Sequence, residues 1–409
     1  MPTTQRYDLY SHEFRLTTHE TYARMRAESP VHLQPGLDGE TPIWFVTRYD
    51  DVVALLTDNE SFVLDPALVF TPEELAAREA EGFVPDERVN ENLLAKDGDD
   101  HRRLRRLVTK AFTPRMVEGL RPRIQEIADE LVDRVEAAGR MELVDDFAFP
   151  LPITVIAELL GVPAGDQDRF RTWSNTFVLP PVTPELQELT RRHTDEFVEY
   201  LDGLFAARRA EPTDDLISAL VRAEDEGDHL SQNELYSMVV LLIVAGHETT
   251  VSLITNAVHT LLTHPEELAA LRADPSLMAN AVEELLRFES PVERTITRWV
   301  ARDIELGGAP LRRGELVIAV VGSANRDADQ FAGAHLLELR RSDNRHVGFG
   351  RGPHYCLGAP LARLETEIAL ETLFRRLPGL RLDIAEGDLY WRPIPIFRSL
   401  ASLPVAWDV

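Results

Sequence analysis

The chain has 409 residues and a formal net charge of −26 at pH 7, from 43 basic and 69 acidic side chains. Hydrophobic residues make up 44% and charged residues 27%, which excludes a disordered or collagen-like chain. The acidic balance argues against a nucleic-acid binder and against docking on anionic lipid. Cys356 is the one cysteine, so an intrachain disulfide is excluded and we expect a cytoplasmic protein.

The N-terminal residues 1–12 are polar and lack the apolar segment of a signal peptide. The longest apolar run, Met238 to Gly246, has nine residues, short of the ~20 that span a bilayer. We therefore expect this run to lie in a buried core helix, and we expect no membrane association.

Helical patterns dominate the chain between its short strand-like segments. Helices are predicted over 18–28, 101–111, 115–138, 151–160, 184–209, 213–223, 231–264, 265–290 and 359–377. Strands are predicted over 43–47, 295–300, 303–306 and 316–321, with short strands and turns over 380–409. Residues 60–98 are acidic with few periodic signals, and we expect a mobile loop region there. The fold class is mainly α with a minor β portion, in a single domain over 1–409.

The longest predicted helix begins with a capping-box pattern. Ser231 caps its start and Glu234 reaches back, and apolar residues then recur every three to four positions as far as His264. Pro265 disfavours continuation, so the helix has about 33 residues and, at ~1.5 Å per residue, is long enough to cross a domain.

Helix propensity is low in the middle of this helix. Gly246, Thr249 and Thr250 are poor helix formers, and an acid, Glu248, stands among apolar residues. Such a conflict indicates a functional site. The alternative is that the Ala245–Gly246 pair only permits close helix packing and that Glu248 points to solvent.

The most informative segment is the decapeptide 349–358, Phe-Gly-Arg-Gly-Pro-His-Tyr-Cys-Leu-Gly. Its glycines and proline make the backbone tight and irregular, and Cys356 falls just before a predicted helix, where peptide dipoles favour an anion. A thiolate in this position is suited to ligating iron. An inert buried cysteine would not need this glycine pattern, and the spacing differs from that of a nucleotide-binding loop.

With its F-G-x-G-x-H-x-C-x-G spacing, this decapeptide resembles the signature of the cytochrome P450 superfamily of haem-thiolate monooxygenases, especially the soluble bacterial members. Four other motifs follow the order of that family: His101-Arg102-Arg103-Leu104-Arg105, Ala245-Gly246-His247-Glu248-Thr249-Thr250, Glu284-Leu285-Leu286-Arg287, and Arg298 on a strand. The resemblance therefore covers nearly the whole chain.

The resemblance implies the cytochrome P450 fold, with haem b between the long central helix and the helix after the cysteine loop. Cys356 would be the axial thiolate, which favours O–O cleavage. The residues implied to contact the haem are His101, Arg105, Arg298, Phe349 and His354. Glu248 and Thr249 match the acid–alcohol pair that delivers protons to dioxygen.

The same resemblance gives Glu284 and Arg287 a structural role as an ion pair that a third arginine completes. The chain departs from the family pattern there: Ala334 stands where proline is usual and Leu336 where arginine is usual. His335, Arg340 or Arg341 would have to compensate. Asp97-Gly98 also replaces the Asp-Pro that commonly precedes the His101 motif.

The expected reaction inserts one oxygen atom from dioxygen into a lipophilic small molecule by hydroxylation or epoxidation. The alternatives are a peroxide-driven hydroxylase and a non-catalytic haem-binding sensor or electron carrier. The stretch between His101 and Arg115 is basic and contains no acid. We expect an acidic ferredoxin, reduced by a separate ferredoxin reductase, to dock on the face of this stretch that Arg102, Arg103, Arg106 and Lys110 form. We expect a monomer that serves secondary metabolism.

By the same resemblance, the substrate pocket is formed by segments 83–95, 173–180, 241–249, the neighbourhood of Val292, and 394–397. The pocket residues named for it are apolar: Leu94, Val178, Leu241, Val244, Ala245, Val292, Ile396 and Phe397. A lipophilic guest such as a macrolide, terpenoid or steroid follows from this lining.

Overall fold

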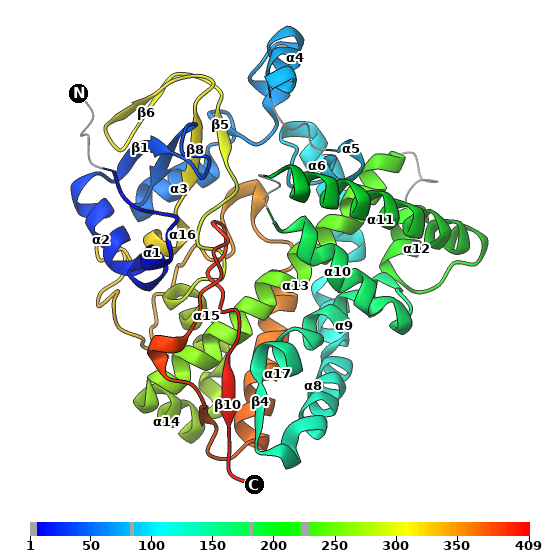
Figure 1. Cartoon of the computed structure of the whole chain (residues 1–409), viewed down its shortest axis with the longest axis vertical. Helices are drawn as coiled ribbons and strands as arrows, with labels where there is room; N and C mark the ends of the chain where they lie inside the picture. Colours follow the sequence, from blue (N-terminus) through cyan, green and yellow to red (C-terminus); the bar gives the residue numbers. More distant parts are fainter. Residues whose placement is uncertain (1–5, 82–85, 180–182, 223–229) are drawn as a thin grey trace. The chain divides into compact units, whose positions relative to one another are not determined.

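The computed structural model describes residues 6–81, 86–179, 183–222 and 230–409 (Figure 1). The chain divides into two compact units. Unit 1 comprises residues 1–63, 121–150 and 249–409, and unit 2 comprises residues 64–120 and 151–248. Most elements are helices and the strands are short, as predicted.

The main sheet of unit 1 has five strands. Their order is β1 (Val31–Pro35), β2 (Pro42–Val46), β8 (Leu316–Ala319), β5 (Arg298–Val300) and β3 (Phe62–Val63). Only β2 and β8 pair in parallel. Since side chains alternate along a strand, the two faces bury different residues. Trp44 and Val46 pack with α3 (Tyr49–Thr57), whereas Phe45 packs with α1 (His12–Leu16) and α2 (Thr18–Glu28).

Two smaller sheets and most of the remaining helices complete unit 1. One sheet joins β4 (Arg140–Glu142), β10 (Pro404–Ala406) and β9 (Arg381–Leu382), and the other joins β6 (Ile304–Leu306) and β7 (Ala309–Leu311). The helices are α8 (Arg121–Val135), α14 (Pro265–Ala273), α15 (Met278–Phe288), α16 (Val321–Ala324) and α17 (Ala359–Arg376). α17, which follows the cysteine loop, packs on α8 and α15.

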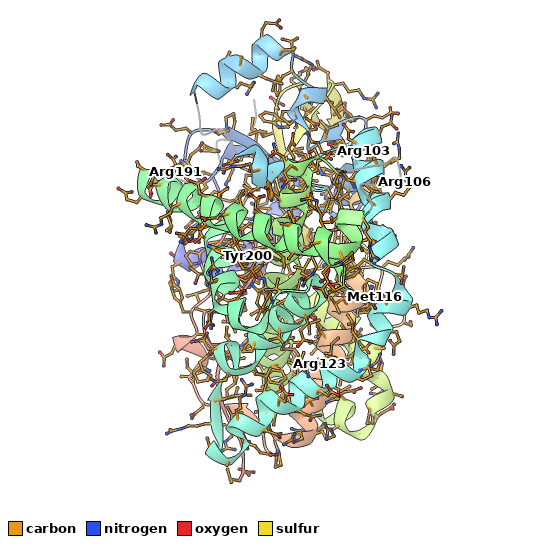
Figure 2. All side chains as sticks on the ribbon, turned by 90° about the vertical axis from the view of Figure 1, so that its right-hand side faces the viewer. Arg103, Arg106, Met116, Arg123, Arg191 and Tyr200 are labelled. Atoms are coloured by element: carbon orange, nitrogen blue, oxygen red, sulfur yellow. The ribbon has the colours of Figure 1, made fainter. Side chains whose placement is uncertain are left out.

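Unit 2 is built from helices. They are α4 (Pro72–Glu81), α5 (Glu87–Asn90), α6 (Gly98–Ala111), α7 (Pro114–Gly119), α9 (Pro150–Leu160), α10 (Gln167–Phe177), α11 (Pro184–Ala210) and α12 (Leu216–Arg222). α11 contacts α10 and α12. Edge-to-face contacts of Phe170 and Trp173 with Phe197, at 5.8 and 5.3 Å between ring centroids, join α10 to α11. Figure 2 shows Arg191 and Tyr200 along α11.

The longest helix, α13, spans Gln232–Thr263 and contributes to both units. Its capping box is confirmed: the Ser231 amide donates to Glu234 Oε2 at 2.7 Å, and the Glu234 amide donates to Ser231 Oγ at 3.1 Å. By length and composition alone α13 would suffice to cross a membrane, with a mean hydropathy of 1.7 over its most apolar stretch, but 67% of that stretch is buried. It is therefore a core helix, as expected.

The prediction of a loop over 60–98 was wrong. This segment contains β3, a 3-10 turn (Pro66–Leu68), α4 and α5. The start of α4 is a capping box, because the Thr71 amide donates to Glu74 Oε2 at 2.8 Å and the Glu74 amide donates to Thr71 Oγ1 at 3.3 Å. This capping signal was present in the sequence, but apolar periodicity alone does not detect it.

The prediction of one helix over 115–138 was also wrong, because the helix breaks between α7 and α8. Pro122 in the first turn of α8 has no amide hydrogen and excludes the carbonyl of the preceding turn, so a continuous helix cannot pass it. The pattern also missed α1, α3, α10, α16, β1, β4 and β7, each short or mixed in polarity. The predicted helix 265–290 is two helices, α14 and α15, separated by a 3-10 turn at Pro275–Leu277. Residue 223 of the predicted helix 213–223 lies outside the described residues.

Candidate functional site

The loop that carries Cys356 is fixed by backbone hydrogen bonds within unit 1. The Cys356 amide donates to the Phe349 carbonyl at 2.9 Å, and the Gly350 amide donates to the Val347 carbonyl at 2.9 Å. Gly352 has a φ of 72°, and a Cβ there would lie 2.7 Å from the Leu56 carbonyl oxygen. Glycine is thus required at 352 by the close approach of the loop to α3.

Cys356 is half-buried and lies two residues before Gly358, the N-cap of α17. The start of this 18-residue helix carries a partial positive charge, which favours a negative group nearby. A Cβ at Gly358 would lie 3.9 Å from Cys356 Sγ, so a side chain there would come into contact with the sulfur. Glycine at 358 therefore keeps a side chain away from the sulfur.

A second network of unit 1 ties this loop to α15 and α17. The Arg363 guanidinium donates to both oxygens of Glu283, at 2.5 and 2.9 Å, and its carbon lies 4.5 Å from the centroid of the Phe349 ring. Arg363 also donates to the Tyr355 hydroxyl at 3.4 Å, and His346 Nε2 lies 3.0 Å from Glu283 Oε2. Burial by itself would raise the pKa of Glu283, but the hydrogen bonds from His346 and Arg363 lower it to about 2.

Sequence analysis missed Glu283, His346 and Arg363. Glu283 is the acid directly before Glu284, and its contacts join segments that are 63 and 80 residues apart. Pairing of that kind leaves no local pattern, so only the tertiary structure identifies it.

Glu284 and Arg287 form the expected ion pair, with both side chains fully buried. Two hydrogen bonds of 2.8 Å join the guanidinium to the carboxylate. The third arginine is Arg341, whose Nε lies 3.2 and 3.1 Å from the two carboxylate oxygens of Glu284. Arg340 instead lies on the surface near Asp274. Leu336, at the usual arginine position, contributes its backbone carbonyl to Arg287 at 2.8 Å.

Arg298, on β5 in the main sheet, is 3% exposed. Its guanidinium donates to the carbonyls of Leu55 and Phe62, at 3.5 and 3.3 Å. A buried guanidinium is suited to an anionic group such as a carboxylate. His354 lies at the end of the short 3-10 turn Gly352–His354, two residues before Cys356.

In unit 2, His101 and Arg105 lie one turn apart on α6, with His101 buried and Arg105 half-buried. The start of α6 is fixed by Asp97, whose Oδ2 accepts from the amides of Leu64 and Asp65 at 2.5 and 2.9 Å. Gly98 has a φ of 60°, which proline cannot adopt. Glycine in place of the proline that is common at this position therefore gives the backbone a conformation that proline could not take.

Glu248 is 1% exposed, which rules out the alternative that it points to solvent. Its Oε2 lies 3.8 Å from Nε2 of the buried His247, whose Nδ1 lies 2.8 Å from the Ile243 carbonyl. Ser174 Oγ on α10 is 3.4 Å from His247 Nε2. Sequence analysis did not predict that the side chains of His247 and Glu248 lie close together.

The packing part of that alternative is supported. A Cβ at Gly246 would lie 3.3 Å from the side chain of Ile156 on α9, so glycine allows the two helices to pack closely. Ala245 is exposed although it lies in the middle of a core helix. Gly246 therefore serves helix packing, whereas Ala245 stays exposed.

The residues expected to line a pocket fall into both units. In unit 2, Leu241, Val244 and Ala245 share one face of α13 and are half-buried or exposed, Val178 is half-buried and Leu94 is exposed. In unit 1, Val292 and Phe397 pair in an isolated β-bridge, and Ile396 lies beside them in the chain. Residues 83–85 and 180 of the expected pocket segments lie outside the described residues.

The expected docking face on α6 needs one correction. Arg103 is bonded to Glu234 of the capping box of α13 and is only 27% exposed, so it belongs to the internal packing of unit 2. Arg102 pairs with Asp99 on the surface, and Arg106 is exposed. Figure 2 shows Arg103 and Arg106 on α6. The side chain of Lys110 lies outside the described part of the structure.

Comparison with known proteins places these features among related chains. Residues 39–378 match the family model described as "Cytochrome P450". The chain is 46% identical to "Cytochrome P450 107B1" of Saccharopolyspora erythraea over 96% of this chain and 95% of the relative. It is 44% identical to "Mycinamicin IV hydroxylase/epoxidase" of Micromonospora griseorubida over 96% of each chain.

The fold is also similar to that of a solved cytochrome P450 structure. The crystal structure of the myxobacterial cytochrome P450 CYP267B1 in complex with myristic acid superposes with a TM-score of 0.92. The two chains are 46% identical, and the match covers 98% of this chain and 99% of the other.

Proposed function

The chain belongs to the cytochrome P450 family and is a monooxygenase of that family, and from this premise we propose that it hydroxylates or epoxidises a lipophilic small molecule at a haem held by Cys356. The observation that carries the proposal is the cysteine loop. Its glycines and its amide-to-carbonyl bond at Cys356 hold the cysteine just before the start of α17. We also propose that the whole chain works as one domain, since the family match of 39–378 runs through both units.

The residues present fit a haem. In unit 1, Cys356 precedes a helix start and Arg298 is a buried guanidinium, which suit an iron ligand and a carboxylate partner. His101, Arg105, Arg298 and His354 are the proposed partners of the propionates, and Phe349 would lie beside the ring. Haem iron with a thiolate ligand supplies, when bound, the activation of dioxygen.

Replacing the sulfur tests the assignment. Cys356→Ser removes the thiolate, and a serine hydroxyl cannot donate the same electron density. We expect the reduced, CO-treated variant to lose the Soret band that marks thiolate ligation, while haem absorbance is kept at least in part. A variant that retains the band would show that Cys356 is not the ligand.

We propose that Glu248 and Thr249, which are consecutive on α13, deliver protons to dioxygen during the reaction. Glu248 is buried against His247, so its carboxyl group is screened from bulk water. The Thr249 hydroxyl is suited to hold a hydrogen bond at the dioxygen site. Thr249→Ala should keep substrate binding but divert reducing equivalents to peroxide; an unchanged yield of product per NADH would contradict the role.

The proposed lipophilic class of the substrate is supported by the apolar lining, by a relative named mycinamicin IV hydroxylase/epoxidase and by a similar structure in complex with myristic acid. Mycinamicin IV, myristic acid, a terpenoid and a steroid form a suitable panel. A spectral shift on titration would mark displacement of water from the haem iron. Failure of the whole panel, in the presence of an intact thiolate band, would contradict the proposed class.

The proposed electron donor is an acidic ferredoxin that docks near Arg106. Exposed charges steer such contacts, and salt screens them within ~10 Å at 0.1 M. Arg106→Glu should weaken ferredoxin-supported turnover and leave peroxide-supported turnover unchanged. Arg191→Glu on α11 is the control for a change of surface charge elsewhere. Equal losses with both electron sources would place the damage at the haem instead.

A further inference from the structure

A buried ion network in unit 1 contacts two of the segments that we propose as pocket walls. The network joins α1 and α2 to the segment 291–295 and to the turn 394–398. Its charged members are Arg15, Arg294, Arg398, Glu293 and Glu289, each less than 10% exposed. Charges that far inside a protein need defined partners, so the arrangement of these segments is closely specified.

The two wall segments are held together by their own backbone. The Glu293 amide donates to the Ile396 carbonyl at 2.8 Å, the Arg398 amide donates to the Pro291 carbonyl at 2.9 Å, and Val292 pairs with Phe397. The side chains of Val292, Ile396 and Phe397 remain half-buried. They are therefore partly exposed side chains on a backbone that hydrogen bonds hold in place.

Arg15 of α1 ties these segments to the N-terminal helices. Its Nη1 donates to Glu293 Oε2 at 2.9 Å and to the Phe397 carbonyl at 3.4 Å, and its Nη2 donates to the Ile394 carbonyl at 2.7 Å. Arg398 donates back to the Arg15 carbonyl at 2.5 Å. One guanidinium thus spans a carboxylate of the first wall segment and two carbonyls of the second.

We propose that Arg15 is a positioning residue that sets the shape of the substrate pocket by fixing the turn 394–397 against Glu293. This inference rests on the proposed function, because it takes Val292, Ile396 and Phe397 as pocket walls. It assigns a role in substrate choice to the N-terminal helix α1, which lies outside the cysteine loop and outside the matched range 39–378.

Arg294 provides a matched control. It is as deeply buried as Arg15, at 1% exposure, and lies 3.2 Å from the same carboxylate. Its side chain bonds the Tyr22 hydroxyl and the Leu9 carbonyl, both at 2.8 Å, and not the turn carbonyls described for Arg15. The two arginines therefore share burial and charge partner but differ in what they position.

The test compares Arg15→Lys with Arg294→Lys in the full-length haem protein. Lysine keeps the charge beside Glu293 but presents one compact donor group, which cannot span the carboxylate and both carbonyls. We expect amide hydrogen exchange of Phe397 and Arg398 to speed up about tenfold in Arg15→Lys and to stay near the wild-type rate in Arg294→Lys. Affinity for 4-phenylimidazole and the ratio of products should change only in Arg15→Lys, with the reduced-CO band intact in both.

Two results would overturn the inference: wild-type exchange at 397–398 in Arg15→Lys, or equal changes in both variants, which would indicate a general stabilising role. If Arg15→Lys does not accumulate as folded protein, Arg15→Gln and Arg294→Gln are compared in the same way, since glutamine still donates one hydrogen bond. If the wild type oxidises no lipophilic compound, the proposed function fails, but the exchange rates still decide whether Arg15 fixes the turn.

Discussion

The cysteine loop and the α10–α11 pair are stabilised in opposite ways. Around the loop, Glu284 and Arg287 are fully buried, and Glu283 holds Arg363 and His346. On α11, the side chains of Arg191 and Glu188 are 60% and 64% exposed, and the helix is held to α10 by aromatic contacts. Buried ion pairs specify one geometry, whereas apolar contacts with surface charges tolerate change. The region that would ligate iron is thus held by buried ion pairs, whereas α10, whose C-terminal end lies in the proposed pocket segment 173–180, is held to α11 by aromatic packing.

The largest loss of stability should come from replacing Arg341, the arginine that completes the buried ion pair of Glu284 and Arg287. Arg341→Leu leaves Glu284 with one guanidinium fewer in a site without solvent, so we expect a loss of about 3–5 kcal/mol in the free energy of unfolding. Urea unfolding followed by haem absorbance measures it. Arg340→Leu, at the exposed neighbour, should cost under about 1 kcal/mol. Equal losses in both variants would refute the assignment of Arg341 as the third arginine.

The next effect is a pH dependence at Glu283. Its pKa of about 2 lies below the ordinary 4.5, so the unfolded state binds the proton more tightly. The stabilisation is therefore fully present above about pH 4.5 and is lost as the pH falls toward 2. Glu283→Gln should lower stability by about 2 kcal/mol at pH 7, after allowance for partial exposure, and flatten the profile in that window. An unchanged acid profile would argue against this role of Glu283.

A smaller effect of opposite sign is expected at Glu365 on α17. Both of its carboxyl oxygens are buried and have no hydrogen-bond partner among the residues that the structure describes, and burial raises its pKa well above the ordinary value. The raised pKa means that this group costs stability increasingly as the pH rises above its unfolded pKa. Glu365→Met should therefore stabilise the protein by about 1 kcal/mol at pH 7 and by less at pH 4. Thermal unfolding at the two pH values is the measurement, and destabilisation at both would indicate a missed partner.

The smallest effect is expected on α11. Arg191 pairs with Glu188 and Asp195 on the surface (Figure 2), and such pairs contribute little. Arg191→Ala should change the free energy of unfolding by less than about 0.5 kcal/mol. Chemical denaturation at low and high salt checks this value. A loss above about 1 kcal/mol would remove the contrast between the two regions.

Local signals in the sequence were sufficient for much of the helical framework and for the chemical centre. The capping box at Ser231 and Glu234 set the start of α13, and the helix ended within a residue of the prediction, before Pro265. The glycine spacing around Cys356 indicated a tight loop, and a side chain at Gly352 would prevent its conformation. Both signals act within a few residues of the chain, and the same local patterns identified the family.

The tertiary structure alone decided which distant residues meet. Arg341, rather than His335 or Arg340, completes the pair of Glu284 and Arg287, because the chain after Leu336 brings its guanidinium to the carboxylate. The bond of Arg103 to Glu234 joins residues 131 apart. The contact of Arg15 with Glu293 spans 278 residues. Long-range pairs of this kind depend on how packed elements converge, a property that composition, periodicity and motif spacing along the chain do not encode.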